Sequence, residues 1–371
     1  MTKTLITGGA GFIGAHLASH LLAAGEDVRV LDSLVEQVHG DVERPEYLGS
    51  DVELIVGDVR DRDAVAKALV GVDKVVHLAA RVGVGQSMYE IAEYTSANTG
   101  GTAVLLEAIL DHPIERLVVA SSMSVYGEGL YLGPDGTPVA SADRTRRQLE
   151  SGRWETCGVN GEQLTPVPTP ETKPPSLTSV YALNKYDQER LCLMFGQAYK
   201  TPTVALRFFN VYGPYQALSN PYTGVLAIFA SRLLNDRAPL IFEDGEQRRD
   251  FVSVHDIARA CALAADPANE AADGAVINIG SGQSVTVNEI ATRLARILGK
   301  DVEPEVTGKY RVGDIRHCFA DISRAKELLG FEPAVSMDDG MTELAEWLEG
   351  QVAVDHVDAA ASELAARGLT V

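Results

Sequence analysis

Short apolar runs rich in β-branched residues alternate with longer stretches of helical periodicity along the first part of the chain. The short runs predict buried strands, which we place at residues 3–7, 28–31, 52–56, 74–78 and 116–120. The longer stretches space their apolar residues three and four apart, which predicts helices at residues 12–24, 61–69 and 89–110. Strands that alternate with helices in this way predict an α/β fold with a parallel, doubly wound sheet.

The pattern changes between about residues 130 and 178, where glycine, proline and threonine are frequent (GPDGTPVASADRT, then PVPTPETKPPSLTS). This composition predicts a long surface loop with little regular structure. A helix at residues 181–199 and a strand at 203–207 follow it. From about residue 215 the predicted elements become shorter and their connections irregular, which indicates a smaller second lobe.

The composition narrows the class of partner. The chain has 371 residues and a formal net charge of −20, and nucleic acid is disfavoured because phosphate binding requires basic patches. No apolar run reaches the 18 or so residues of a membrane span, and no signal-peptide pattern precedes the first strand. We therefore expect a cytoplasmic protein with neither a membrane nor a nucleic acid as its partner.

The cysteines do not suggest a metal site. Cys157, Cys192, Cys261 and Cys318 are scattered and form no CxxC pair. This spacing argues against a zinc site and against a disulfide framework. We expect no bound metal.

A glycine-rich turn follows the first predicted strand. Gly8, Gly11 and Gly14 follow directly after that strand, at the start of the helix predicted at residues 12–24. Small residues there let the backbone approach a pyrophosphate, and the helix N-terminus offers free N–H groups to it. Asp32 ends the second predicted strand, 18 positions after Gly14. A carboxylate there accepts hydrogen bonds from a ribose diol and repels a 2′-phosphate, so we predict NAD rather than NADP.

A second group of residues points to proton transfer. Tyr181 and Lys185 are four apart on one predicted helix, and an ammonium close to a phenol would lower the phenol pKa from its usual value of about 10. Ser122 follows the strand at residues 116–120, and a parallel sheet collects its active groups at the carboxyl ends of its strands. We predict that Tyr181 is a general base and that Ser122 hydrogen-bonds the hydroxyl it deprotonates.

Together with these groups, motifs along nearly the whole chain resemble the extended short-chain dehydrogenase/reductase family, in its NAD-dependent nucleotide-sugar epimerase/dehydratase branch. The motifs are TGGAGFIG at 7–14, GDVRD at 57–61, HLAA at 77–80, SSMSVYG at 121–127, YALNK at 181–185, LRFFNVYGP at 206–214 and RDFVSVHDIA at 249–258. The resemblance implies a Rossmann-type NAD-binding domain at residues 1–214 that carries the inserted loop. It also implies a smaller α/β substrate-binding lobe at 215–350, discontinuous with parts of that domain, and leaves a helical tail at 351–371.

The resemblance also implies roles for individual residues. The cofactor-binding residues would be Gly8, Gly11, Phe12, Ile13, Gly14, Asp32, Asp58, Val59, Leu78, Ala79, Ala80, Asn98, Ser121, Tyr181, Lys185 and Phe208. The substrate-binding residues would be Ser122, Asn210, Val225, Arg249, Arg311 and Asp314, with the two arginines on the diphosphate. The catalytic residues would be Ser122, Ser124, Tyr181 and Lys185. An alternative for the arginines is that they pair with nearby acids such as Asp250.

The stretch Ser122, Met123 and Ser124 bears on the reaction. Members of this family that resemble 4,6-dehydratases carry an acidic pair here, which eliminates water, whereas a thioether and a hydroxyl cannot do that work. We therefore predict a nucleotide-sugar 4-epimerase that oxidises C4, lets the 4-keto sugar rotate, and returns the hydride to the other face. The alternatives are a C3/C5-epimerase, a decarboxylase or a 4,6-dehydratase of the same branch, and, in a different class, a non-catalytic NAD-binding sensor.

Two departures bear on the substrate. Tyr126 and Tyr181 are 55 residues apart, and the intervening insertion is similar to that of bacterial dTDP-L-rhamnose 4-epimerases. Cys318 stands where some galactose epimerases have a tyrosine, which would leave a roomier sugar pocket, unless it is simply a buried strand cysteine. We predict dTDP-L-rhamnose or a related dTDP- or UDP-hexose as the substrate, and the resemblance alone implies a homodimer.

Overall fold

The computed structural model describes residues 2–139, 144–220, 222, 224–311, 313–351 and 355–370. Within them, a seven-stranded parallel sheet has the order β14-β9-β5-β4-β1-β2-β3. Its strands are β1 (Lys3–Thr7), β2 (Asp27–Asp32), β3 (Glu53–Val56), β4 (Lys74–His77), β5 (Arg116–Ser122), β9 (Thr203–Phe208) and β14 (Val276–Ile279). The predicted α/β fold with a doubly wound parallel sheet is therefore confirmed, and the alternating pattern had located every strand except β14.

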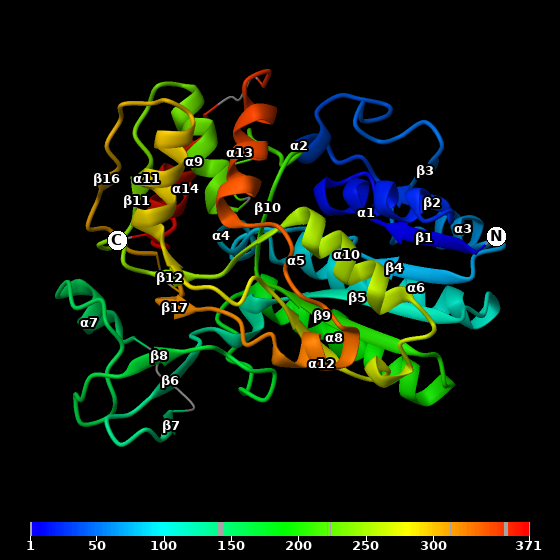
Figure 1. Cartoon of the computed structure of the whole chain (residues 1–371), viewed down its shortest axis with the longest axis horizontal. Helices are drawn as coiled ribbons and strands as arrows, with labels where there is room; N and C mark the ends of the chain where they lie inside the picture. Colours follow the sequence, from blue (N-terminus) through cyan, green and yellow to red (C-terminus); the bar gives the residue numbers. More distant parts are fainter. Residues whose placement is uncertain are drawn as a thin grey trace.

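Helices cover both faces of this sheet (Figure 1). Those bearing on the central sheet are α1 (Phe12–Ala23), α3 (Arg62–Leu69), α6 (Gly101–Asp111), α8 (Val180–Tyr199), α10 (Val254–Ala265) and α12 (Ser323–Leu329). Successive strand residues point to opposite faces, so Ile6 of β1 packs in the core under α1 and α10, whereas Leu5 packs in the core under α3, α6 and α8. Both side chains are fully buried, as expected for a parallel sheet covered on both sides.

The predicted helix at residues 89–110 is interrupted. The structure has α4 (Val84–Ser87), α5 (Ile91–Thr95), a π-helical turn at Ser96–Gly100, and then α6. The wider turn lets the fully buried Asn98 bond the backbone of Arg81, through Arg81 N to Oδ1 (2.6 Å) and Nδ2 to Arg81 O (3.0 Å). The expectation of one regular helix was wrong here, because a tertiary contact outweighs the local periodicity.

The second lobe has its own apolar core. Its helices α9 (Val225–Leu234), α11 (Val287–Ile297) and α13 (Met337–Leu348) pack together at one end of the molecule (Figure 1). Short strands form three small sheets apart from the central one. These are β10 (Asn210–Tyr212) with β13 (Phe251–Ser253), β11 (Leu240–Ile241) with β16 (Glu305–Val306), and β12 (Arg248–Arg249) with β15 (Val285–Thr286) and β17 (His317–Cys318). The remaining short helices are α2 (Glu36–His39) and the 3₁₀ turns at Met123–Tyr126 and Glu270–Ala272.

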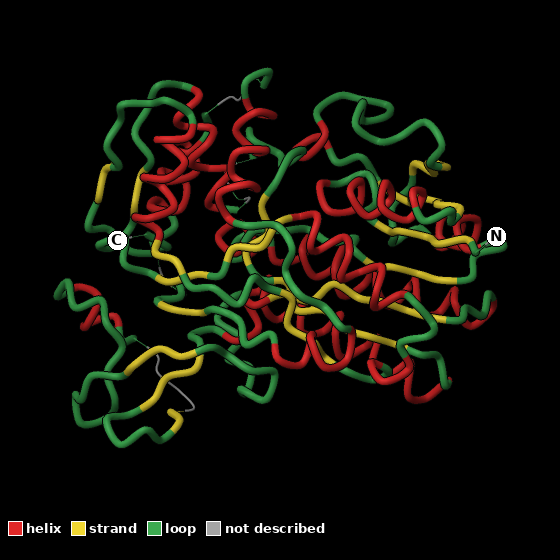
Figure 2. Tube along the Cα trace, in the orientation of Figure 1, coloured by secondary structure: helices red, strands yellow, loops and turns green. Residues whose placement is uncertain are grey.

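The insertion folds into a small unit that projects from the body of the molecule (Figure 2). Its described part has a three-stranded antiparallel sheet of β6 (Leu130–Leu132), β7 (Pro138–Val139) and β8 (Thr165–Val167). The short helix α7 (Arg146–Glu150) lies between β7 and β8 in the chain. The unit is nevertheless rich in loops. The expectation of little regular structure missed this sheet because its strands are only two or three residues long.

The tail forms α14 (Val357–Ala366), which is tied to both lobes. Asp355 and Asp358 pair with Arg232 of α9, while Arg367 lies 4.3 Å from the centre of the Tyr89 ring.

Among the described residues, no helix is long and apolar enough to cross a membrane, and no group of three or more His, Cys, Asp or Glu could hold a metal ion.

Candidate active site

The glycine turn forms a cradle at the carboxyl end of β1. Gly8 has φ +68°, and a Cβ there would lie 2.8 Å from the backbone of Ala79; a Cβ on Gly14 would lie 2.4 Å from Gly9 Cα. Gly11 is the N-cap of α1 and provides no side-chain cap, so the first-turn N–H groups of Phe12 and Ile13 keep their donor capacity for an anion. This cradle, which side chains would fill, fits a dinucleotide pyrophosphate.

Asp32 ends β2 beside that cradle. Its Oδ2 accepts a hydrogen bond from Ala10 N (3.0 Å) and its Oδ1 from Leu34 N (2.9 Å). These contacts fix a carboxylate next to the turn, where it can accept from a ribose diol and repel a 2′-phosphate. The geometry therefore fits NAD.

Tyr181, Ser122 and Ser124 meet at the carboxyl end of β5. Ser122 Oγ lies 3.2 Å from Ser124 Oγ and accepts from Ser124 N, so Ser122 caps the 3₁₀ turn at Met123–Tyr126. Ser179 caps the N-terminus of α8, and Tyr181 N donates to Ser87 Oγ (3.0 Å), so the start of α8 is held against α4. The predicted serine–tyrosine pair is thus brought together.

Burial raises the pKa of the Tyr181 phenol above 10, and a hydrogen bond with Ser122 partly offsets this effect. Lys185 Nζ does not pair with the phenol; it donates to Ala120 O (2.8 Å) and Gln188 Oε1 (2.9 Å). The expected lowering of the phenol pKa by the lysine is therefore not found. Burial lowers the pKa of Lys185 to about 8.

Gln188 is a residue that the sequence reasoning missed. Its Oε1 accepts from Lys185, and its Nε2 lies 2.9 Å from Thr102 Oγ1 and 3.1 Å from His77 Nε2. His77 is fully buried, and burial followed by the Lys185 charge lowers its pKa to about 3, so it stays neutral. Position i+3 from the lysine was the available signal, because it places Gln188 on the same helix face.

Several predicted cofactor residues have other partners. Ser121 Oγ donates to Glu189 Oε2 (2.7 Å), inside a buried pair of Glu189 with Arg207. Asn98 bonds the Arg81 backbone, as described above, so both side chains hold the protein rather than reach toward a ligand. Asp58 is paired with Arg60 at 2.6 Å, and this hydrogen bond lowers the pKa of the carboxyl group.

The other predicted cofactor residues lie along the same edge of the sheet. Leu78 N donates to Thr7 O, and Ala79 N lies 3.3 Å from Thr7 Oγ1. Phe208 ends β9, where it is paired in register with Ser122 of β5. The remaining two positions follow β3 and β4 in turn: Val59 and Ala80.

A pocket opens beside Ser124. It is lined mostly by apolar side chains from both lobes and from the tail. The lining residues are Val84, Gly85, Met88, Ser124, Thr178, Ser179, Tyr222, Val225, Ile228, Phe229, Leu240, Phe242, Arg311, Gly313, Asp314, Ile315, Val357, Ala360, Ala361, Leu364 and Leu369. Three predicted substrate residues, Val225, Arg311 and Asp314, are among them, whereas the five from the tail were not foreseen.

Two more predicted substrate residues differ in their surroundings. The Oδ1 of Asn210 is buried without a hydrogen-bond partner, which leaves an acceptor for a ligand. Arg249 donates to the carbonyls of Ile315 and Arg316 and lies 3.6 Å from Asp314, outside the pocket lining. The alternative that the arginines pair with nearby acids holds for Asp314, which lies within ion-pair distance of both Arg249 and Arg311. It does not hold for Asp250, which accepts from Ser281 and Gly282.

Arg311 keeps a partly exposed guanidinium at the pocket. Its Cζ lies 4.5 Å from the centre of the Phe242 ring, and its Nε lies 3.7 Å from Asp314. Stacking leaves much of the planar donor fork available for a phosphate. Cys318 is 1% exposed within β17, in agreement with the simpler reading of a buried strand cysteine.

A dinucleotide cradle, a buried tyrosine with two serines, and a neighbouring pocket define an NAD-dependent enzyme of the short-chain dehydrogenase/reductase type. The model of the NAD dependent epimerase/dehydratase family matches residues 4–148 and 154–280. The chain belongs to this family.

Individual relatives match over nearly their full length. The dTDP-L-rhamnose 4-epimerase of Burkholderia thailandensis is 39% identical over 351 residues, which are 93% of this chain and 94% of the relative. The putative UDP-glucose 4-epimerase of Methanocaldococcus jannaschii is 30% identical, with 93% and 98% covered.

Solved structures agree with these matches. The Thermotoga maritima UDP-glucose 4-epimerase with UDP-glucose has a TM-score of 0.75 at 31% identity, covering 94% of this chain and 99% of that one. The Thermus thermophilus UDP-glucose 4-epimerase in complex with NAD has a TM-score of 0.74 at 29% identity, covering 95% and 100%. The predicted family, NAD cofactor and nucleotide-sugar epimerase class are therefore confirmed.

Proposed function

We propose that the enzyme inverts C4 of a nucleotide-activated 6-deoxyhexose, with dTDP-L-rhamnose as the first candidate. The observation that carries this proposal is the apolar wall of the pocket next to the catalytic tyrosine. The 39% identity to the Burkholderia thailandensis dTDP-L-rhamnose 4-epimerase supports the same substrate class.

The apolar wall is built from α4 and α14. Ser87 Oγ accepts a hydrogen bond from Tyr181 N, so α4 lies against the start of α8. Val84, Gly85 and Met88, which line the pocket, are the neighbours of Ser87 along the chain. Leu364 of α14 packs on Gly85, so closely that a Cβ on this glycine would lie 3.3 Å from it. A sugar whose C4 hydroxyl reaches Tyr181 would present its C5 substituent to apolar atoms, which favours a methyl over a hydroxymethyl or carboxylate group.

The residues would share the work as follows. Tyr181 accepts the proton of the C4 hydroxyl and later returns it, while Ser122 and Ser124 hold the oxygen in place. Lys185, anchored on Ala120 O and Gln188, would bind the cofactor ribose rather than act on the phenol.

The other binding groups would hold the two nucleotides. Gly8, Gly11 and Gly14, with Asp32, would bind NAD, which when bound removes hydrogen from C4 and gives it back. Arg311 would bind the diphosphate end of the substrate, and Asn210 Oδ1 would accept from a substrate hydroxyl, which leaves the 4-keto sugar free to turn about its diphosphate. A homodimer and a cytoplasmic location belong to the same proposal, as expectations from the family.

The purified enzyme should invert C4 of dTDP-L-rhamnose with a kcat/KM about 10-fold above that for dTDP-L-mannose, which differs from it only by the hydroxyl on C6, since an apolar pocket discriminates modestly against one added hydroxyl. The measurement is an NMR assay with dTDP-, UDP- and GDP-sugars. The variant Leu364→Asn should bring the kcat/KM values of the two substrates closer together. Leu348→Asn is not a suitable control, because Leu348 is buried in the core of the second lobe. Retention of C4 configuration across the whole panel would overturn the epimerase proposal and favour a non-catalytic NAD protein.

A further inference from the structure

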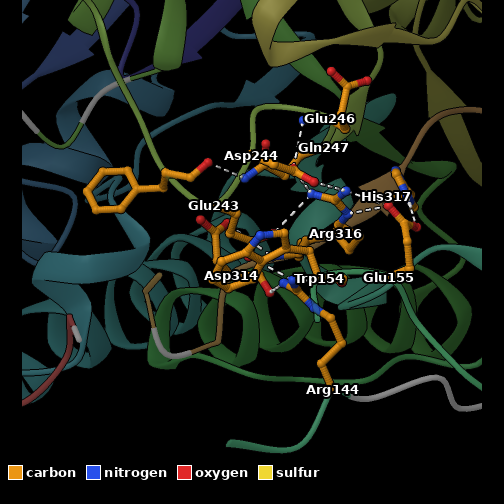
Figure 3. A network of polar contacts seen from close by, with 12 residues as sticks. Arg144, Trp154, Glu155, Glu243, Asp244, Glu246, Gln247, Asp314, Arg316 and His317 are labelled. Atoms are coloured by element: carbon orange, nitrogen blue, oxygen red, sulfur yellow. Dashed lines mark hydrogen bonds and ion pairs between the residues drawn. The ribbon is translucent and has the colours of Figure 1, made fainter. Parts of the chain in front are cut away.

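The inserted unit, defined here as residues 130–178, sends one arginine into the substrate lobe. The Arg144 side chain is 3% exposed although it lies on a projecting segment. It bonds Glu243 Oε1 (2.7 Å) and donates to the carbonyl oxygen of Asp314 (2.9 Å), and it lies 3.3 Å from Glu128 (Figure 3). A buried guanidinium with this many partners is a fixed anchor rather than a surface charge.

A second arginine, Arg316, contacts the same Glu243 carboxylate. Arg316 contacts the other carboxylate oxygen of Glu243 (3.1 Å) and both oxygens of Asp244 (2.6 and 3.0 Å). Glu243 therefore bridges the two arginines, and its own side chain is only 1% exposed (Figure 3).

The insertion contributes a further carboxylate to the same network. Glu155 accepts from Arg316 and from His317 Nε2 (3.0 Å). His317 Nδ1 accepts from Arg248 N (3.1 Å), so the ring carries its proton on Nε2 and donates it to Glu155. These bonds lower the pKa of Glu155 to about 2.

This network lies next to the end of the pocket that is lined by Arg311 and Asp314. Arg144 holds the main chain at Asp314, and Asp314 and Arg311 both line the pocket, three residues apart. Trp154 of the insertion also faces Tyr310, with ring centres 6.3 Å apart. Burial acts to raise the pKa of Asp314, but Arg311, Arg249 and Arg144 outweigh it and lower the pKa.

Charge balance makes Arg144 important beyond its contacts. Four carboxylates, those of Glu128, Glu155, Glu243 and Asp244, face only two arginines in this network, since His317 is neutral with its single ring proton on Nε2. Removing Arg144 leaves the same four carboxylates with one arginine, which increases the excess of negative charge. A negative charge in a poorly solvated site close to the pocket repels a diphosphate.

We propose that the insertion is a positioning element of the substrate site, in which Arg144 fixes the main chain at residues 313–316 and thereby sets the affinity for the nucleotide diphosphate of the substrate. The inference rests on the proposed function for the identity of that ligand. It assigns no chemistry to Arg144, which touches none of the groups that react.

The test compares Arg144→Met and Arg144→Lys with the matched control Arg147→Met. Arg147 lies on α7 of the same insertion and is exposed. Arg144→Met should raise KM for dTDP-L-rhamnose and the Kd for dTDP about 10-fold, a loss of about 1.4 kcal/mol, with kcat changed less than about two-fold. Arg144→Lys should recover part of the affinity, and Arg147→Met should behave as the parent enzyme.

Calorimetric titration with dTDP separates this inference from the proposed function. Tight dTDP binding with no turnover of any sugar would overturn the proposed function only. An unchanged dTDP Kd in Arg144→Met, or a loss confined to kcat, would overturn the positioning role. If that variant does not fold, Arg144→Lys replaces it, because lysine keeps the charge but loses the planar fork that bonds both Glu243 and the Asp314 carbonyl; a weaker dTDP affinity supports the inference and an unchanged one refutes it.

Discussion

Replacing Tyr181 by phenylalanine should lower kcat for C4 inversion about 1,000-fold, within the range typical of a lost general acid–base group. The phenol is the group that meets Ser122 at the end of β5. Folding should be preserved, because Tyr181 is held at α8 through its backbone N–H on Ser87 rather than through its hydroxyl. The measurement is single-turnover NMR of the sugar product with NAD content determined in parallel.

The matched control is Tyr199→Phe, which removes a hydroxyl from the same helix at a 59% exposed position. This variant should keep the parent rate. A Tyr181→Phe enzyme with near-normal turnover would show that another group moves the proton, and the assignment of the site would have to be abandoned.

Adding one methyl group at Gly14 should remove most of the bound NAD. The Cβ of Gly14→Ala would lie 2.4 Å from Gly9 Cα and 2.7 Å from its carbonyl, and backbone cannot yield as a flexible side chain can. The turn must open, which costs about 1–3 kcal/mol by overpacking and moves the N–H groups that face the pyrophosphate. Cofactor content of the purified protein, read by absorbance after denaturation, should fall well below one per chain.

Gly49→Ala is the control for this experiment, since nothing lies within 4 Å of a Cβ at that position. It should retain both NAD and the parent melting temperature. Full NAD occupancy in Gly14→Ala would mean that the pyrophosphate does not depend on this turn.

Local pattern was sufficient for the parts of the fold that local physics controls. The two-residue period separates Leu5 from Ile6 onto opposite faces, and a turn between strand and helix requires glycine where backbones meet, so both could be predicted from residues near in sequence. The pairing of Ser122 with Tyr181 followed from the rule that parallel strands end together at one edge of the sheet.

The partners of charged side chains could not be predicted in this way. Lys185 donates to Ala120 O because α8 packs on β5, and nothing in the Tyr-x-x-x-Lys spacing shows which side of the helix meets the strand. Arg144 and Glu243 are 99 positions apart, and Arg316 and Glu155 are 161 apart. Such pairs depend on the tertiary arrangement of the insertion, whose composition indicated only a loop.

The tail that walls the pocket has a consequence for how new specificities arise. Helix α14 supplies Val357, Ala360, Ala361 and Leu364 to the lining, yet it lies after every strand of the central sheet and contributes none of the predicted catalytic residues. Exchange of the segment after residue 350 would therefore replace the α14 part of this wall while leaving the cofactor cradle and the proton-transferring residues intact. Sugar preference in this architecture can change through one short C-terminal segment, without substitutions in the folded core.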